Sequence, residues 1–289
     1  ALGVEKLQMW DLYAPIADGD SPDLEYEQAK EYVIDAVEPL GEPYRDRMAE
    51  GLESRWVDVY ETANKQSGAY SGGTYDSQPY ILLNYQDDIA SMYTLAHELG
   101  HSMHSEFSSE HQPYVYSGYE IFVAEVASTV NEALLTQHLL ETVEDERFRR
   151  HVLDEYLERF RSTLFRQAMF ADFEHRAHEL EAAGEALTPD RLDELYGGLK
   201  RDYYEPAAVD DRIAREWMRI PHFYRAYYVY QYATGISAAN AIVDRIATEG
   251  EPAAADYREF LRPGSREYPL ELLEIAGIDM SSSAPVEAA

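Results

Sequence analysis

The feature that most constrains this chain is a pair of histidines, His97 and His101, with Glu98 directly after the first. Residues four apart on an α-helix share a face about one turn apart, so both imidazoles can reach one metal ion. This HExxH pattern is typical of zinc sites in which the glutamate takes a proton from metal-bound water while the histidines stay neutral. The spacing therefore predicts a helix over residues 93–105 that binds one zinc ion, with Glu98 as the general base.

Core packing is the alternative explanation, because histidines also occur in buried helices. A third histidine, His104, lies one turn beyond His101. Helix rise places its backbone about 10 Å along the axis from that of His97, which is too far for one ion to bind all three histidines. We therefore expect His104 to lie in the cleft or beside the ligands. Apolar residues at helical spacing put the motif at a buried edge rather than on a solvated face. These residues are Leu95, Ala96, Leu99 and Met103.

A third metal ligand is expected from a second helix that starts near Gly118. Glu125 lies in the apolar stretch 121–127, where an unpaired carboxylate would be costly and a metal ion would neutralise it. The separation from the first histidine also leaves room for a turn and a return along the first helix. We predict Glu125 as the third ligand, with Glu120 or Glu132 as the next choices. The fourth position is left to water, as in an open catalytic site.

The composition is strongly acidic, with 55 acidic and 24 basic residues, a net charge of −31 and only four lysines. Such a surface repels nucleic-acid phosphates and anionic membranes, so neither is expected as a partner. We interpret the charge as an adaptation to concentrated salt, in which counterions screen self-repulsion, and an ordinary acidic protein is the alternative. The expected location is the cytoplasm of a halophile with high internal salt. No cysteine is present, which excludes disulfides and thiol chemistry.

The rest of the chain reads mainly as helix. Residues 1–22 are expected to form an irregular lead-in, and residues 281–289 a loose tail. The stretch 65–85 combines glycines and tyrosines and ends in a short predicted strand at 79–84. That strand suggests either a plain hairpin or a sheet edge at the cleft that pairs with an extended peptide.

An aromatic stretch at residues 220–235 is the last informative segment. Part of it is expected to be a buried helix seam. If the segment is helical, Tyr227 and Tyr230 share a face at i, i+3. A phenol there could donate a hydrogen bond to the oxyanion of a tetrahedral intermediate.

Together these segments resemble oligoendopeptidase F, within the wider thimet-oligopeptidase family of zinc metallopeptidases. The matching segments follow the family's order over most of the chain. They are 68–70 (GAY), 74–76 (TYD), 79–84 (PYILLN), 94–104 (TLAHELGHSMH), 122–128 (FVAEVAS) and 221–235.

The resemblance implies a mainly α, zincin-type catalytic domain over residues 1–289, with a small β-sheet or hairpin beside the cleft. It implies hydrolysis of short to medium oligopeptides, with His97, His101 and Glu125 as zinc ligands and Glu98 activating water. The resemblance also places substrate-binding and oxyanion-stabilising residues in the aromatic stretch. These residues are His222, Tyr227 and Tyr230, with Tyr228 as the alternative to Tyr227.

One departure concerns length, because members of the family are about twice as long and this chain corresponds to their C-terminal half. The resemblance therefore leaves three expectations open. The chain acts alone, it pairs with a missing N-terminal half, or it is a catalytically silent fragment that binds peptides. A related zinc exopeptidase is a further alternative within the enzymes.

Overall fold

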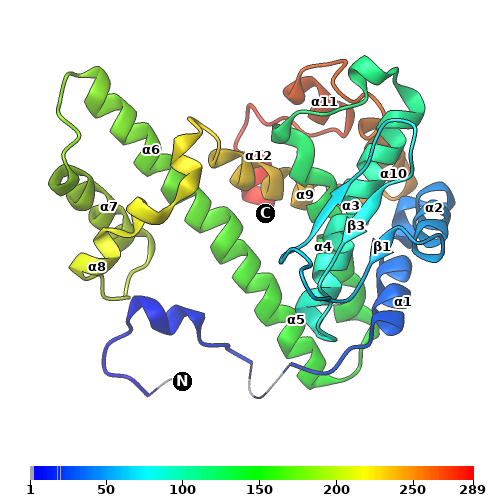
Figure 1. The fold of residues 1–289 in the computed structure, drawn as a ribbon, viewed down its shortest axis with the longest axis horizontal. Helices are drawn as coiled ribbons and strands as arrows, with labels where there is room; N and C mark the ends of the chain where they lie inside the picture. The colour runs from blue at the N-terminus through cyan, green and yellow to red at the C-terminus, as the bar shows by residue number, and fades with distance from the viewer. Residues whose placement is uncertain (1–2, 18, 20) are drawn as a thin grey trace. The chain divides into compact units, whose positions relative to one another are not determined.

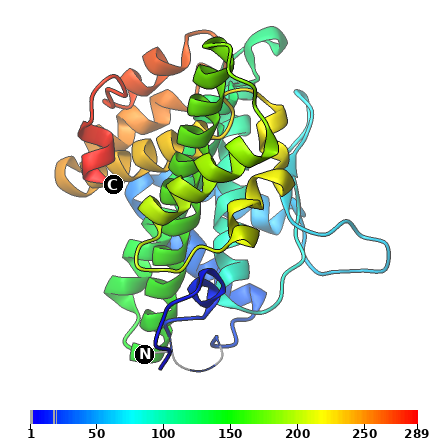
Figure 2. The same ribbon diagram turned by 90° about the vertical axis from the view of Figure 1, so that its left-hand side faces the viewer.

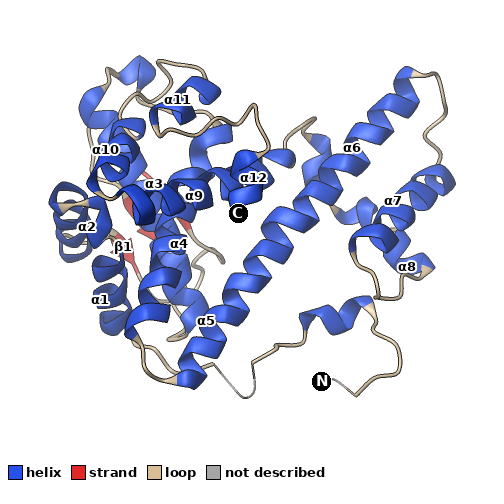
Figure 3. Ribbon diagram, turned by 180° about the vertical axis from the view of Figure 1, so that it is seen from behind, coloured by secondary structure: helices blue, strands red, loops and turns tan. Residues whose placement is uncertain are grey.

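The computed structural model describes residues 3–17, 19 and 21–289, and it divides into two compact units (Figure 1). Unit 1 comprises Ala1–Ile16 and Leu157–Ala233, and unit 2 comprises Ala17–Tyr156 and Thr234–Ala289. In the described part of the chain, helices dominate and the strands form one small sheet in unit 2 (Figure 3). That residues 1–289 work as one catalytic domain stays a prediction.

Unit 2 is organised around two long antiparallel helices, α3 (Ile89–His111) and α4 (Ile121–Thr142). Helix α3 extends beyond the predicted stretch 93–105 at both ends, and the Asp88 side chain caps its start by accepting a hydrogen bond from the Ser91 amide at 2.7 Å. The two helices are joined by buried polar pairs as well as by apolar packing. One such pair is Tyr93 Oη and Thr136 Oγ1, 2.7 Å apart. The other helices that lie wholly in unit 2 are α1 (Tyr26–Ala36), α2 (Glu42–Glu53), α10 (Glu251–Phe260), α11 (Pro269–Ile275), α12 (Ala284–Ala288) and the 3₁₀ helices η2 (Glu38–Leu40) and η3 (Tyr114–Tyr116).

The backbones of α3 and α4 approach each other closely at Gly100, which lies between the two histidines of the motif. A Cβ atom at this position would lie 2.5 Å from the carbonyl oxygen of Ala127 and 2.5 Å from the Cα of Ser128. No real side chain fits at that separation, so glycine is what lets the two backbones touch. Buried residues of both helices, such as Leu99 and Val126, then pack into the main core.

The sheet of unit 2 has the strand order β1 (Val57–Asp58), β3 (Tyr80–Leu82), β2 (Tyr70–Gly72). Strand β1 pairs with β3 in parallel and β2 pairs with β3 antiparallel, which confirms the strand expected at 79–84. Ile81 on β3 is buried, and the hydroxyl of Ser71 on β2 lies 2.8 Å from that of Ser102 on α3. Part of the chain between β1 and β2, light blue in Figure 2, projects away from the sheet.

Unit 1 is a smaller helical body with its own core. Its largest helices are α6 (Arg166–Ala182) and α7 (Pro189–Tyr203), which contribute Phe170, Phe173 and Tyr196 to that core. The short elements are the 3₁₀ helices η1 (Met9–Tyr13), η5 (Glu216–Arg219) and η6 (Pro221–Tyr224), the π-helical turn η4 (Phe160–Phe165) and α8 (Asp211–Ala214). The residues of α5 (Glu146–Arg159) and α9 (Tyr230–Glu249) are divided between the two units. No helix in the described part of the chain has the length and apolarity of a membrane span.

Short helices occur within both of the segments that the sequence analysis expects to be irregular. The lead-in contains η1, whose Met9 is buried in the core of unit 1 and whose start is held by a 2.8 Å hydrogen bond from the Gln8 amide to Asp11. The tail forms α12, with Pro285 buried. In each segment one residue is buried, and the polar composition of the segment does not predict that burial. The lead-in expectation also falls on residues 1, 2, 18 and 20, which lie outside the described residues.

Replacing Gly100 by alanine should destabilise the protein, because the added methyl group must push α4 away from α3. We expect a loss of about 1–3 kcal/mol in the free energy of unfolding, measured by chemical denaturation. The matched control is Gly198→Ala on α7, where a Cβ meets nothing within 4 Å. There alanine should stabilise the helix by about 0.5–1 kcal/mol. Equal effects of the two substitutions would contradict the close approach.

Candidate metal centre

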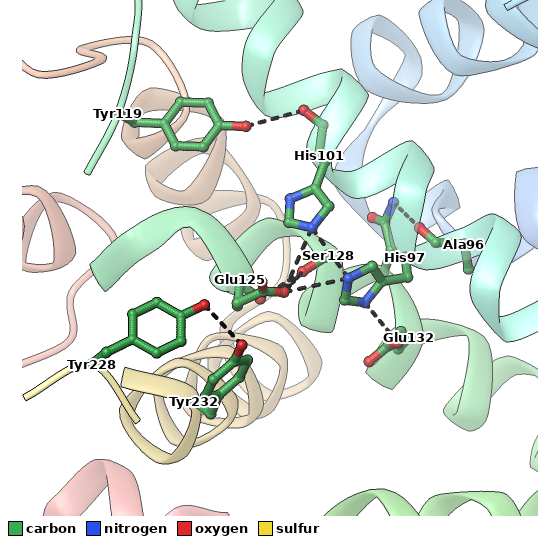
Figure 4. A network of polar contacts seen from close by, with 10 residues as sticks. Ala96, His97, His101, Tyr119, Glu125, Ser128, Glu132, Tyr228 and Tyr232 are labelled. Carbon is green, nitrogen blue, oxygen red and sulfur yellow. Dashed lines mark hydrogen bonds and ion pairs between the residues drawn. The ribbon is translucent and has the colours of Figure 1, made fainter. Parts of the chain in front are cut away.

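Helices α3 and α4 bring the three predicted ligands together (Figure 4). His97 Nε2 lies 3.1 Å from His101 Nε2, and Glu125 Oε2 lies 3.3 Å from the first of these atoms and 3.5 Å from the second. The three side chains are partly buried, and they form the group of metal-ligating residues found among the described residues. Gly235 on α9 backs the site, since a Cβ there would lie 3.4 Å from that of Glu125.

The dimensions of this triangle fit a small divalent ion. Bonds of about 2.0–2.1 Å at tetrahedral angles place neighbouring ligand atoms about 3.3–3.4 Å apart. The observed separations of 3.1, 3.3 and 3.5 Å bracket that value. Two imidazoles and one carboxylate fill three corners of a tetrahedron, so the donor set matches an open site rather than a closed structural one.

Glu132 contacts the other nitrogen of His97. Its Oε1 lies 2.9 Å from His97 Nδ1, so it accepts the Nδ1 proton, and the lone pair of Nε2 faces the triangle once a metal ion displaces the proton of that nitrogen. The second histidine is fixed in a similar way, because His101 donates a hydrogen bond to the backbone of Ala124. Glu132 thus lies next to the ligands without joining their triangle. Glu120, the other alternative considered from the sequence, is exposed at the N-terminus of α4.

The charges of the site are tightly coupled. Burial lowers the pKa of His97, but the carboxylates of Glu132 and Glu125 outweigh burial and raise that pKa to about 10. Burial raises the pKa of Glu125, yet the hydrogen bond from His97 and its charge prevail and lower it to about 2. The pKa of His101 is lowered to about 4, first by burial and then by the charge of His97. The carboxylates of Glu125 and Glu132 are therefore stabilised by a positive charge between them. A divalent cation supplies that charge in place of the extra proton on His97.

Glu98, the base predicted from the sequence, follows His97 directly and is electrostatically coupled to His97 and Glu125. Its side chain is buried, and burial is the main reason why its pKa is raised. The backbone amide of Ser71 on β2 donates a hydrogen bond to the Glu98 carboxylate. Because the Ser71 hydroxyl also contacts that of Ser102, strand β2 is linked to α3 at Glu98 and again one turn further along the helix. Neither contact of Ser71 could be predicted from the sequence, because no local pattern connects residue 71 with residue 98 or residue 102.

His104 is buried rather than exposed in a cleft. Its ring stacks on that of Tyr119 at a centroid distance of 3.7 Å, and burial lowers its pKa to about 3. Tyr119 in turn donates to the carbonyl oxygen of His101 at 3.4 Å (Figure 4). His104 is therefore a neutral packing residue that supports the backbone of the ligand helix. Its exclusion from the ligand set agrees with the helix-rise argument.

The aromatic stretch is less helical than the sequence predicted. Helix α9 begins only at Tyr230, and Tyr227 precedes it with a φ of 54°, in the left-handed region. These two tyrosines therefore do not share a helix face, which removes the i, i+3 argument. The amide of Tyr227 donates to Glu174 at 2.8 Å, which holds the unusual backbone in place.

The other residues expected in the substrate site also lie in unit 1. His222 is in η6, with its ring 5.6 Å from that of Tyr228. The Tyr228 hydroxyl lies 2.8 Å from that of Tyr232 (Figure 4). The assignment of substrate binding to His222, Tyr227 and Tyr230, with Tyr228 as the alternative, stays a prediction.

Replacing Glu132 by glutamine should weaken metal binding, because the neutral amide polarises the His97 imidazole less than a carboxylate does. We expect a loss of about 10–100-fold in affinity, measured by competition with a chromophoric chelator. The matched control is Glu120→Gln, which removes the same charge from the exposed start of α4 and should leave affinity unchanged. Glu125→Ala gives the reference for loss of a ligand. Unchanged affinity in Glu132→Gln would contradict an orienting role for Glu132.

This chain is similar to known proteins over its whole length. The family model described as Peptidase family M3 matches residues 1–289. The chain is 50% identical to oligopeptidase PepF of Bacillus subtilis, covering 100% of this chain and 43% of that protein. It is 44% identical to an oligoendopeptidase F homolog of Lactococcus lactis, covering 100% of this chain and 48% of that one.

Solved structures show the same fold. A putative peptidase from Chlamydophila abortus superimposes with a TM-score of 0.89 at 41% identity, covering 99% of this chain and 48% of that one. Oligoendopeptidase-F from Enterococcus faecium superimposes with a TM-score of 0.73 at 38% identity, covering 98% and 44%. The expected mainly α, zincin-type fold with a small sheet is thereby confirmed, and the chain spans about half the length of the relatives it matches. The chain belongs to peptidase family M3, a family of metallopeptidases.

Proposed function

We propose that this protein is a zinc-dependent endopeptidase that hydrolyses short to medium oligopeptides. The observation that carries the proposal is the triangle of His97, His101 and Glu125, with the buried base Glu98 beside it, in a chain of a metallopeptidase family. Nitrogen and carboxylate ligands at these separations suit zinc, and one ion accounts for all three.

The residues of the chain divide the chemical work. His97 Nε2, His101 Nε2 and Glu125 Oε2 would hold the ion, while Glu132 keeps the His97 Nδ1 proton in place. Zinc supplies Lewis acidity, which activates a water molecule and polarises the scissile carbonyl. Glu98 accepts the proton of the attacking water at its carboxylate and passes it to the leaving amine.

Strand β2 is the proposed docking edge for the peptide backbone. In the described part of the chain β2 pairs only with β3, so its other edge can add an extended peptide by main-chain hydrogen bonds. Pairing of this kind reads the backbone more than the side chains, which suits an enzyme for varied short peptides. For the oxyanion we propose a phenol among Tyr227, Tyr228 and Tyr230, with His222 binding substrate.

The matched relatives are about twice as long as this chain, which motivates a proposal about a partner. A segment equivalent to their remaining half would act with this chain on the same substrates.

Assays of this chain should be run in concentrated KCl, because its composition is strongly acidic. Zinc content should be measured on the same sample as turnover.

Replacing Glu98 by glutamine should abolish turnover while zinc stays bound, because the amide keeps the shape of the side chain but cannot take a proton. We expect a fall of about 10²–10⁴-fold in kcat. Zinc content is measured by atomic absorption and turnover with an internally quenched peptide. Full activity in a zinc-loaded Glu98→Gln protein would remove Glu98 from the mechanism.

An internally quenched peptide blocked at both ends should be cleaved, because an endopeptidase needs no free terminus. A matched peptide with free ends is the control. An exopeptidase would cleave only the free peptide. A catalytically silent domain would bind both peptides and cleave neither, even with one zinc ion per chain, and that result would refute the proposed activity.

A further inference from the structure

Basic residues are concentrated in unit 1. This unit holds 12 of the 24 basic residues and 16 of the 55 acidic ones, so its net charge is −4, whereas unit 2 carries −27. Acidic side chains in unit 2 thus account for most of the charge of the protein. Unit 1 is where an anion meets the least repulsion.

A cavity of about 400 Å³ lies within unit 1, between η1, α7, α8 and η5. This volume is in the range of small-molecule pockets. Glu216 is the one acid among the lining residues. The side chains that carry the argument are Trp10, Tyr13, Lys200, Arg212, Arg215 and Arg219.

The charge at this cavity is not balanced. Glu216 alone pairs with Arg166 at 2.8 Å, Lys200 at 2.7 Å and Arg219 at 2.5 Å, and it also accepts the Tyr196 hydroxyl at 2.9 Å. Three cations therefore share one carboxylate, and none of them has another acidic partner among the described residues. Two positive charges remain without an anion. Lys200 and Arg219 both line the cavity.

The neighbouring groups do not remove this excess. Arg212 pairs with Asp210 and Arg215 pairs with Asp193, so neither of these two acids compensates the charge of Lys200 or Arg219. The side chain of Lys200 is only 3% exposed, and burial lowers its pKa although Glu216 opposes the shift. The Tyr204 ring, 4.5 Å from the ammonium, offsets part of the cost.

The remaining wall is flat and apolar. Trp10 and Tyr13 extend from η1 and are 54% and 63% exposed. The guanidinium of Arg212 lies 5.8 Å from the Trp10 ring, so cation and aromatic face occur side by side. Such a wall stacks well on a planar apolar group.

We propose that this cavity binds a small phosphate monoester that carries a flat apolar group. The phosphate lies against Lys200 and Arg219, and the flat group packs on Trp10. A phosphate monoester carries about −1.5 to −2 charges at neutral pH, which matches the two uncompensated cations. The inference is independent of the proposed peptidase function.

The test is calorimetric titration of the full chain with phenyl phosphate and with inorganic phosphate at one fixed KCl concentration. Phenyl phosphate should bind more tightly than inorganic phosphate. Arg219→Gln should weaken both ligands about tenfold, since a charge-assisted hydrogen bond is lost. Trp10→Leu should weaken only phenyl phosphate. The matched control is Arg176→Gln, an exposed arginine of the same unit that pairs with Asp172 and does not line the cavity.

Three outcomes would overturn the proposal. The first is no saturable binding of phenyl phosphate by the parent chain. The second is equal weakening in Arg219→Gln and Arg176→Gln, which would indicate general attraction to basic side chains. The third is equal affinity for the two ligands, unchanged in Trp10→Leu, which would indicate an adventitious ion only. Thermal unfolding of each variant separates lost binding from lost folding. Both substitutions should leave the unfolding temperature nearly unchanged, because the Arg219 and Trp10 side chains are more than half exposed.

Discussion

The close contact of α3 and α4 at Gly100 is the constraint on which the metal centre depends. The position lies between the two histidines of one helix, and the opposite backbone at Ala127 belongs to the turn that follows Glu125. With a side chain at residue 100, the backbones would have to separate by about 1 Å to relieve a contact of 2.5 Å, and three ligand atoms now 3.1–3.5 Å apart would be displaced from one another. The packing of the two backbones and the spacing of the three ligand atoms therefore both require that residue 100 has no side chain.

Buried hydrogen bonds then hold the helices in register. Asn131 on α4 donates to the carbonyl oxygen of Ala96 at 3.1 Å and accepts the hydroxyl of Tyr44 from α2 at 2.9 Å. Both polar ends of this buried amide are satisfied, so it specifies the pairing of the helices at little cost. One residue further along α4, Glu132 forms a second polar contact with α3, to the Nδ1 atom of His97. The ligand helix is thus positioned by polar contacts on the face that carries the site.

Much of this site follows from the sequence, because its parts lie on two regular helices. The HExxH spacing fixes which atoms of α3 can meet, and an acid in an apolar stretch marks Glu125. The choice between Glu125 and Glu132 depends on which imidazole nitrogen each one reaches, and that requires coordinates. The link from Ser71 to Glu98 could not be predicted, because the packing of β2 against α3 is a tertiary contact that no motif in the sequence marks. Tyr227 escaped prediction because its left-handed backbone depends on a tertiary contact with Glu174.

The locality of the ligands along the chain has a consequence for how the site forms. His97 and Glu125 lie on consecutive helices joined by a short connection, so bringing them together closes only a small loop and loses little chain entropy. Contacts of such low sequence separation form quickly in folding. The contacts of strand β2 with α3 have a similar sequence separation, since Ser71 and Ser102 are 31 residues apart. The segments that carry the ligands and the predicted base therefore form one continuous part of the chain, which can assemble as a unit.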